Sequence, residues 1–311
     1  MFKCCSLPAW CFKAIISTIL AIALLISYPL PVLAQQDERN IIQVFIEAVE
    51  TVVKGRSQRK ELKAPNGRPR GGAGRGRCSS LISLDNNEIP LTAFAPTIQE
   101  QSSPSKLDNV SPYSPYKVDI VWGQTIEEYP TFWFYLPYVY NKSELEYGKF
   151  VLLDKEKNII AGPILVKMPN GNNPSIAKFT LPRNVKPLEV NQEYNWYFSV
   201  LCNPLKASRN PGVTGWIKRI KLPILPPESS SYYVKQGILY DAVTRLFQNQ
   251  KSEIELQKDR VALIKYFLKD VIEKPEKEDK VNEEEKLNKI ANDIASFPIQ
   301  ELIPYSGSIQ N

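Results

Sequence analysis

Apolar and polar positions alternate in short runs through the middle of the chain, between residues 78 and 228. The runs are rich in β-branched and aromatic residues and are separated by turn residues, a pattern typical of strands. The Ser- and Pro-rich residues 97–118 predict a long loop. Short strands at this spacing predict a mainly β domain, an antiparallel β-sandwich for which an immunoglobulin-like arrangement is our working guess. The expected strands are 91–96, 129–140, 148–154, 159–167, 176–181, 194–202 and 213–220.

The spacing of apolar residues becomes helical after this domain. Residues 229–311 contain three successive apolar faces, within 239–247, 261–272 and 287–295, and these predict C-terminal helices. The charged stretch 273–286 lies before the last face and is expected to be a solvated linker and helix face.

A further helix is expected before the strands. In residues 35–54, apolar side chains recur at helical spacing, and Gly55 ends the pattern. We expect this short amphipathic helix to dock on the main domain. A membrane-surface role is the alternative, but the acidic Glu47 and Glu50 on the polar face argue against it.

The first 34 residues have the three parts of a secretory signal peptide. Lys3 and Lys13 supply positive charge, residues 14–26 are apolar, and the small side chains of Val32 and Ala34 occupy the positions that a signal peptidase reads. We therefore expect cleavage after Ala34 and export to the periplasm or the exterior. A retained membrane anchor is the alternative, although the apolar run is short for a span of about 20 residues.

Cysteine usage fits an exported protein. After cleavage the chain keeps Cys78 and Cys202, and two cysteines in an oxidising compartment predict a disulfide. This bond would close a loop of about 120 residues and stabilise the fold by about 4–5 kcal/mol in the chain-entropy model. Two unrelated buried thiols are the alternative. Two cysteines alone cannot form a structural zinc site.

Positive charge is concentrated in residues 55–77, the Arg/Gly segment. It has almost no apolar side chains, so we expect a flexible arm. In an exported chain it would bind an anionic envelope polymer, a lipid surface or an acidic protein face. The export signal argues against RNA binding, and a plain linker without a partner is the remaining alternative. The candidate anion-binding residues are Arg56, Arg59, Lys60, Lys63, Arg68, Arg70, Arg75 and Arg77.

The chain contains no histidine, which excludes Ser-His-Asp and Cys-His catalysis and metal sites that need imidazole. No glycine-rich loop joins a strand to a helix around a phosphate. We therefore expect no enzyme activity, no cofactor and no metal site. The alternative is a glycosidase-like acid–base pair drawn from Asp119, Glu127 and Glu128, which nothing in their spacing singles out.

The most aromatic of the expected strands has large rings on both faces. Phe132, Phe134 and Tyr138 lie on one face, and Trp133 and Tyr135 lie on the other. Core packing of both faces is the favoured interpretation. The alternative is that Trp133 and Tyr135 form an aromatic platform for sugars or peptides.

Two later aromatic residues have similar alternatives. Trp216 could present its ring beside Lys218 and Arg219, but one strand with a buried and an exposed face explains the pattern equally well. Tyr194 begins the strand that ends at Cys202. Its spacing from that cysteine differs from that of the tyrosine corner, so we expect a packing role.

Several blocks, in this order, resemble one family. They are the Gly/Arg residues that end at Cys78, Leu91-Thr92-Ala93, Pro130 to Tyr138, Phe150 to Asp154, Leu181-Pro182, Leu188-Glu189, Tyr194 to Phe198, Cys202-Asn203-Pro204, Gly215 to Arg219, and Gly237 to Ala242. Over residues 67–250 the chain is similar to the cyanobacterial domain of unknown function 928. The resemblance implies an envelope or secreted protein with a β-sandwich-like core and trailing helices, and it implies no activity. The chain departs from the family pattern after Tyr240 and in the charged stretch 273–286.

The sequence therefore predicts an exported, non-catalytic envelope protein that binds an anionic component or a protein partner. A carbohydrate-binding or glycan-acting module that uses strand 129–140 is the main alternative. A structural partner held by the C-terminal helices is a third.

Overall fold

The structure is a computed structural model that describes residues 43–49, 89–101, 117–138, 147–169, 171, 173–202, 210–222, 230–248, 253–268 and 280–305. These residues all lie in the structural unit Asn40–Asn311. In this part of the chain the protein is mainly β, with helices towards the C-terminus. This confirms the mainly β class that the apolar pattern predicts.

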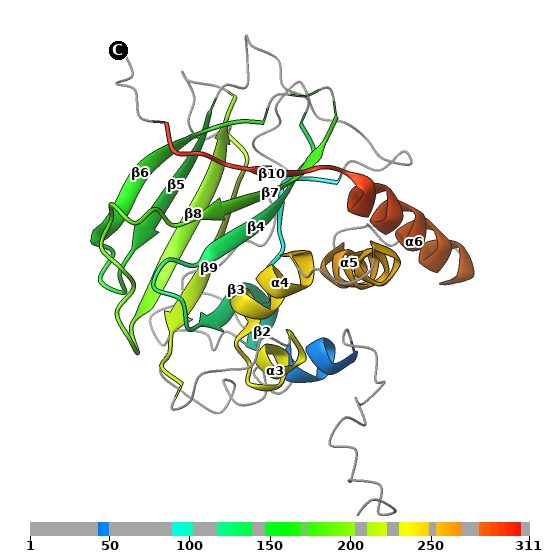
Figure 1. The fold of residues 1–311 in the computed structure, drawn as a ribbon, viewed down its shortest axis with the longest axis horizontal. Helices are drawn as coiled ribbons and strands as arrows, with labels where there is room; N and C mark the ends of the chain where they lie inside the picture. Colours follow the sequence, from blue (N-terminus) through cyan, green and yellow to red (C-terminus); the bar gives the residue numbers. More distant parts are fainter. Residues whose placement is uncertain are drawn as a thin grey trace, which may run out of the picture. The chain divides into compact units, whose positions relative to one another are not determined.

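The strands form two sheets (Figure 1). The six-stranded sheet has the order β2-β3-β9-β8-β5-β6, and the four-stranded sheet has the order β1-β4-β7-β10. Most neighbours are antiparallel, but β3 pairs with β9, and β7 with β10, in parallel. The prediction of a purely antiparallel sandwich is therefore wrong at two pairings, both between strands with long connections. The strands are β1 (Thr92–Ala93), β2 (Thr97–Gln101), β3 (Lys117–Thr125), β4 (Thr131–Leu136), β5 (Tyr147–Leu153), β6 (Ile159–Lys167), β7 (Ser175–Thr180), β8 (Glu193–Leu201), β9 (Gly212–Arg219) and β10 (Ile299–Glu301).

Strands β5 to β9 begin and end within one residue of their predicted bounds. The predicted long loop 97–118 is wrong at both ends, because residues 97–101 form β2 and β3 begins at Lys117. Its middle, residues 102–116, lies outside the described residues. The polar sequence TIQEQ of β2 suits an edge strand, which carries little of the apolar alternation on which the prediction depended.

The first core lies between the two sheets. Phe132 and Phe134 of β4 point into it, where Phe134 stacks on Phe198 at 4.4 Å and Phe132 lies 4.9 Å from Phe150, measured between ring centroids. These rings are fully buried, as is Trp196 of β8. Large aromatic side chains therefore join the two sheets.

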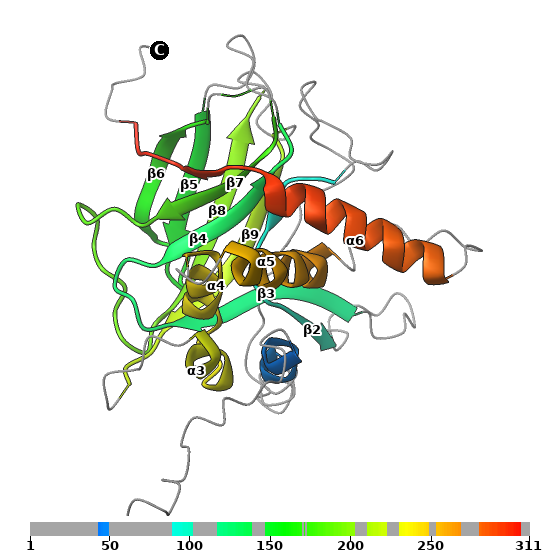
Figure 2. The same cartoon turned by 45° about the vertical axis from the view of Figure 1, so that its right-hand side comes forward.

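The second core lies between the four-stranded sheet and a layer of helices (Figure 2). As predicted, several amphipathic helices follow the strands. No helix among the described residues combines the length and the apolar character that crossing a bilayer requires. The charged stretch 273–286 is helical from Lys280 onwards, and its earlier part lies outside the described residues. The helices are α3 (Ser230–Lys235), α4 (Leu239–Gln248), α5 (Glu253–Leu268) and α6 (Lys280–Ser296).

This helical layer covers the second face of the aromatic strand β4. Trp133 is 3% exposed and stacks on Phe247 of α4 at 4.6 Å, and its Nε1 donates to Oγ1 of Thr244. Tyr135 is fully buried and stacks on Phe297. Core packing of both faces is therefore the correct interpretation. The aromatic platform formed by Trp133 and Tyr135 is wrong, because helices cover both rings.

The helix before the strands docks as expected, over the residues that the structure describes. Residues 43–49 are helical, and Phe45 is fully buried with its ring 6.0 Å from that of Phe267 in α5. Phe94, which follows β1, lies 5.7 Å from the same Phe267 ring. Phe45, before residues 50–88, and Phe94, after them, therefore pack against the same side chain of α5.

The C-terminal segment crosses from one sheet to the other. β10 pairs with β7, and residues 303–305 then pair with β6 at the edge of the six-stranded sheet. Lys167 donates its N–H to the carbonyl of Ile303 at 3.1 Å, and Tyr305 donates to Leu165 at 2.7 Å. Both edge strands on this side thereby gain main-chain partners, which protects them from pairing with other chains.

Candidate functional site

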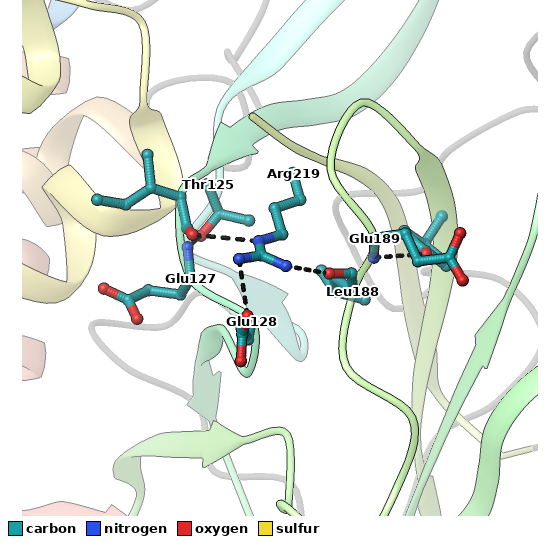
Figure 3. Close-up of polar contacts among 8 residues, drawn as sticks. Thr125, Glu127, Glu128, Leu188, Glu189 and Arg219 are labelled. Atoms are coloured by element: carbon teal, nitrogen blue, oxygen red, sulfur yellow. Dashed lines mark hydrogen bonds and ion pairs between the residues drawn. The ribbon is translucent and has the colours of Figure 1, made fainter. Parts of the chain in front are cut away.

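Arg219, at the end of β9, binds two connecting segments at once (Figure 3). Its Nη1 donates to the carbonyl of Leu188 at 2.6 Å, and its Nε donates to the carbonyl of Ile126 at 3.3 Å. Its Nη2 forms an ion pair with Glu128 at 2.9 Å. A guanidinium presents its donors in a rigid fork, so one side chain fixes the β3–β4 connection against the loop before β8.

The loop before β8 is held by a second bond. Tyr194, near the start of β8, accepts a hydrogen bond at its hydroxyl from the backbone N–H of Glu189 at 2.9 Å. A tyrosine that bonds back to the preceding corner is the geometry of a tyrosine corner. The expectation that Tyr194 only packs is therefore incomplete: its ring is buried, and its hydroxyl also fixes the loop.

A buried carboxyl group lies on the other side of the β3–β4 connection. Asp241, in the first turn of α4, is 6% exposed. Its Oδ1 accepts from the hydroxyl of Thr125, and its Oδ2 accepts from the N–H of Ile126, both at 2.9 Å. Its pKa is raised from 3.8 to about 7, chiefly by burial and also by nearby Glu127, whereas these two bonds and the Arg245 charge act in the opposite direction.

Ile126 joins these two groups. Its N–H donates to Asp241, and its carbonyl accepts from Arg219. The backbone of Ile126, just after β3, thus connects α4 with β9. The Asp241 carboxyl is suited to holding or releasing a proton near neutral pH, but both of its oxygens are occupied inside the fold. The arrangement therefore favours a structural role over proton transfer to a substrate.

Tyr240, the neighbour of Asp241, reaches into the core between the sheets. Its hydroxyl accepts from Nε1 of Trp196 at 2.7 Å and donates to the carbonyl of Trp216 at 3.1 Å. Gly123 of β3 makes room for it, because a Cβ at that position would lie 2.9 Å from the Tyr240 ring. Adjacent residues of α4 therefore contact neighbouring positions, Gly123 and Thr125, on one face of β3.

The side chain of Asp119 lies outside the described residues, so its glycosidase-like pairing with Glu127 or Glu128 stays a prediction. The backbone of Asp119 lies on β3, six residues before Thr125. Glu128 is paired with Arg219, and Glu127 is exposed.

Trp216 does not present its ring beside free cations. Its side chain is 6% exposed, and the guanidinium of Arg219 is bound to Leu188, Ile126 and Glu128. The alternative of one strand with a buried and an exposed face is also wrong, because Val213 to Ile217 of β9 are all buried and Lys218 and Arg219 are half-buried.

The remaining candidate residues are only partly described. Cys202 is disulfide-bonded, but Cys78 lies outside the described residues, so their pairing stays a prediction. All eight basic residues of the Arg/Gly segment also lie outside them. Within the described part of the chain, no three Cys, Asp or Glu side chains come together as potential metal ligands.

Sequence reasoning missed Asp241 and the bonds made by Arg219. Asp241 follows an apolar and an aromatic residue at a helix start, where an acidic residue is ordinarily exposed. Arg219 ends a strand beside Lys218 and has the same appearance as any solvated cation. The partners of both lie about 30 to 120 residues away, and no local pattern indicates such contacts.

Comparison with known proteins gives one match. A family model described as Domain of Unknown Function (DUF928) matches residues 70–276, which is more than half of the chain. No curated protein and no solved structure matches.

Proposed function

We propose that this chain, which belongs to the domain of unknown function 928 family, is an exported, non-catalytic envelope protein that binds an anionic envelope component through the Arg/Gly segment. The signal-peptide pattern of residues 1–34 supports export, and eight basic residues against the single Glu61 within 55–77 support the binding chemistry.

The observation that carries this proposal is the double attachment at Phe267. Phe45 precedes the Arg/Gly segment and Phe94 follows it, and both rings pack against Phe267 of α5. The described residues before and after the basic segment therefore belong to one folded body, so the segment is attached to that body at both ends, which a free tail is not.

The use of polar groups inside the fold supports a non-catalytic role. Asp241, Arg219 and Tyr240 are three described residues with buried or half-buried polar groups. Each of them holds two parts of the fold together.

We also propose that Cys202 pairs with Cys78. Cys202 is disulfide-bonded, and Cys4, Cys5 and Cys11 belong to the proposed signal peptide. This bond would attach the end of the Arg/Gly segment to the end of β8.

An immunoglobulin-like arrangement of the sandwich is part of the proposal. In sequence order, β4 and β7 take the places of strands B and E, and β5, β8 and β9 take those of C, F and G. The Tyr194 hydroxyl bond at the start of the F-like strand supports this assignment. β10 departs from it, because it pairs with β7 in parallel.

The test is a salt titration of binding. The mature chain is mixed with vesicles that contain anionic lipid and, separately, with polygalacturonate. Affinity for at least one of them should fall steeply from low to physiological salt, since charge pairs at a surface are screened over about 10 Å. A variant with all eight basic residues changed to Gln should lose most of the affinity. Binding that is unchanged by salt and by the eight substitutions would refute the proposal.

A further inference from the structure

The exposed large apolar side chains of the described residues share one face of the protein. They are Ile159 (62% exposed), Tyr197 (40%), Ile303 (65%) and Tyr305 (40%). In β8, the neighbours of Tyr197, Trp196 and Phe198, point into the core, so Tyr197 points away from it. The register places the other three side chains on the same side of the six-stranded sheet.

We call this side of β8, β5, β6 and residues 303–305 the outer sheet face. The helices lie against the other sheet, on the opposite side from β5 and β6 (Figures 1 and 2). Large exposed apolar groups gathered on one face of a soluble protein indicate an interaction site.

The C-terminal segment brings two of these side chains to the face. Its pairing with β6 sets Ile303 beside Lys167 and Tyr305 beside Leu165. The Tyr305 ring lies 5.0 Å from the Tyr147 ring of β5. Two tyrosine rings from segments far apart in sequence thus meet on the surface of the sheet.

Two lysines lie beside Tyr147 and Tyr305 on this face. Lys149 follows Tyr147 by two residues on the same face of β5, and Lys167 pairs with Tyr147 from β6. The described residues in these rows include no Asp or Glu: Leu201, Tyr147, Lys167 and Ile303, then Ser199, Lys149, Leu165 and Tyr305, then Tyr197 and Val151, then Asn195, Leu153 and Ile159. The face therefore complements an anionic partner.

The size of the face decides between kinds of partner. Four rows along the strands and four strands across give roughly 20 Å by 14 Å, or about 280 Å². A stable protein–protein interface needs about 800 Å² from each partner. The face is thus too small for a second copy or a protein partner alone, and it suits a narrow polymer. Tyr197 and Tyr305 are less than half exposed, which fits rings that stack on a ligand better than rings that insert into a bilayer.

We propose that the outer sheet face binds an acidic polysaccharide, with Tyr197 and Tyr305 stacking on sugar rings and Lys149 and Lys167 pairing with carboxylate or sulfate groups. This proposal rests on the proposed function, which places the protein in the envelope, and it names the anionic envelope component as an acidic polysaccharide. It places part of the binding on the sheet, outside the Arg/Gly segment.

The experiment uses the mature chain in which the eight basic residues of the Arg/Gly segment are changed to Gln, so that only the sheet contributes. Polygalacturonate is the anionic probe, dextran the neutral one, and anionic vesicles the membrane probe. In this background we compare Tyr197→Ser with Tyr305→Ser as a pair, and Lys149→Gln with Lys167→Gln as a pair. The matched control is Lys221→Gln with Lys258→Gln, two exposed lysines that belong to neither β5, β6 nor β8.

We expect the tyrosine pair to weaken polygalacturonate binding about tenfold, since each aromatic contact contributes roughly 0.5–1.5 kcal/mol. The lysine pair should remove most of the salt dependence, and the control should leave the affinity unchanged. Thermal unfolding checks that each variant is folded.

Equal affinity in all variants, equal binding of dextran, or a larger loss on vesicles than on polygalacturonate would overturn the proposal. The two sites are separable. Loss of all binding on neutralising the Arg/Gly segment would leave the proposed function standing and overturn this inference. Binding that depends only on the outer sheet face would support this inference and overturn the proposed role of the Arg/Gly segment.

Discussion

The hydroxyl oxygen of Tyr240 lies 2.7 Å from the indole nitrogen of Trp196, in the space between the two sheets. Tyr240 belongs to α4, and Trp196 belongs to β8. A helix of the second core therefore completes a hydrogen bond inside the first core. The same hydroxyl donates to the carbonyl of Trp216, so it gives its one proton and accepts one hydrogen bond.

Changing Tyr240→Phe should destabilise the protein by about 1–3 kcal/mol. The ring would still fill its place, but the buried N–H of Trp196 and the carbonyl of Trp216 would lose their partner. Urea unfolding followed by tryptophan fluorescence measures the change. Tyr197→Phe is the matched control, because its side chain is 40% exposed, and it should shift the unfolding free energy by less than about 0.5 kcal/mol. Equal effects of the two substitutions would contradict the assigned bond.

The Asp241 carboxyl should make stability depend on pH between about 4 and 7. Burial raises its pKa from 3.8 to about 7 in the folded state, so the unfolded chain releases this proton at lower pH than the folded chain does. The stability that this group contributes is therefore greatest below pH 4, falls as the pH rises towards 7, and is level above that. The total contribution is roughly 4 kcal/mol at most, since one pKa unit is worth 1.4 kcal/mol.

Asp241→Asn provides the comparison. The amide can still accept a bond from Thr125 or Ile126, but it does not titrate. The unfolding free energy of this variant should be flatter between pH 4 and 7 than that of the unchanged protein. Denaturant unfolding at four or five pH values measures both curves. A variant with the original slope would show that other groups cause the pH dependence.

Arg219→Gln should cost more than Glu128→Gln. The first change removes three contacts at once and leaves the carbonyls of Leu188 and Ile126 without their donor, so we expect a loss of about 2–4 kcal/mol. The second removes one partner that is 55% exposed, and exposed ion pairs contribute about 0–1 kcal/mol. Thermal unfolding of both variants ranks them. The opposite order would mean that the ion pair, and not the carbonyl contacts, fixes the two connections.

The sequence predicts those elements whose side chains alternate locally. In β5, buried and partly exposed residues alternate without a break, and its predicted bounds differ by only one residue. The helix around Phe45 and the helical face from Leu239 to Phe247 are confirmed for the same reason, because their spacing is visible within one or two turns.

Elements set by distant partners were not predictable. β10 has only three residues, and it is a strand because it pairs with the edge of β7. β3 was missed because β9 and β2, which cover it on either side, lie outside any local window. The same holds for the candidate site. Nothing near Asp241 in the sequence indicates that Thr125 will meet it, since 116 residues separate the two.

Trp133 separates the packing interpretation from the sugar-platform interpretation. Its ring stacks on Phe247 at 4.6 Å, and its Nε1 donates to Thr244 at 3.0 Å. Trp133→Ala should therefore cost about 3–5 kcal/mol of stability through the cavity it leaves under α4. Trp133→Phe keeps part of the stack and loses the hydrogen bond, so a smaller loss is expected. Thermal unfolding measures stability, and polygalacturonate affinity is measured on the folded fraction.

Removing the Trp133 ring has a different consequence under each interpretation. If Trp133 packs, the folded fraction of either variant binds the polymer as well as the unchanged protein does, because the ring is 3% exposed and the outer sheet face lies on the other sheet. If it served as a platform, affinity would fall while the melting temperature stayed within a few degrees. A binding defect in a fully stable Trp133→Ala protein would therefore mean that α4 and its Phe247 move away from β4 in solution, and the second core would have to be reconsidered as a mobile cover.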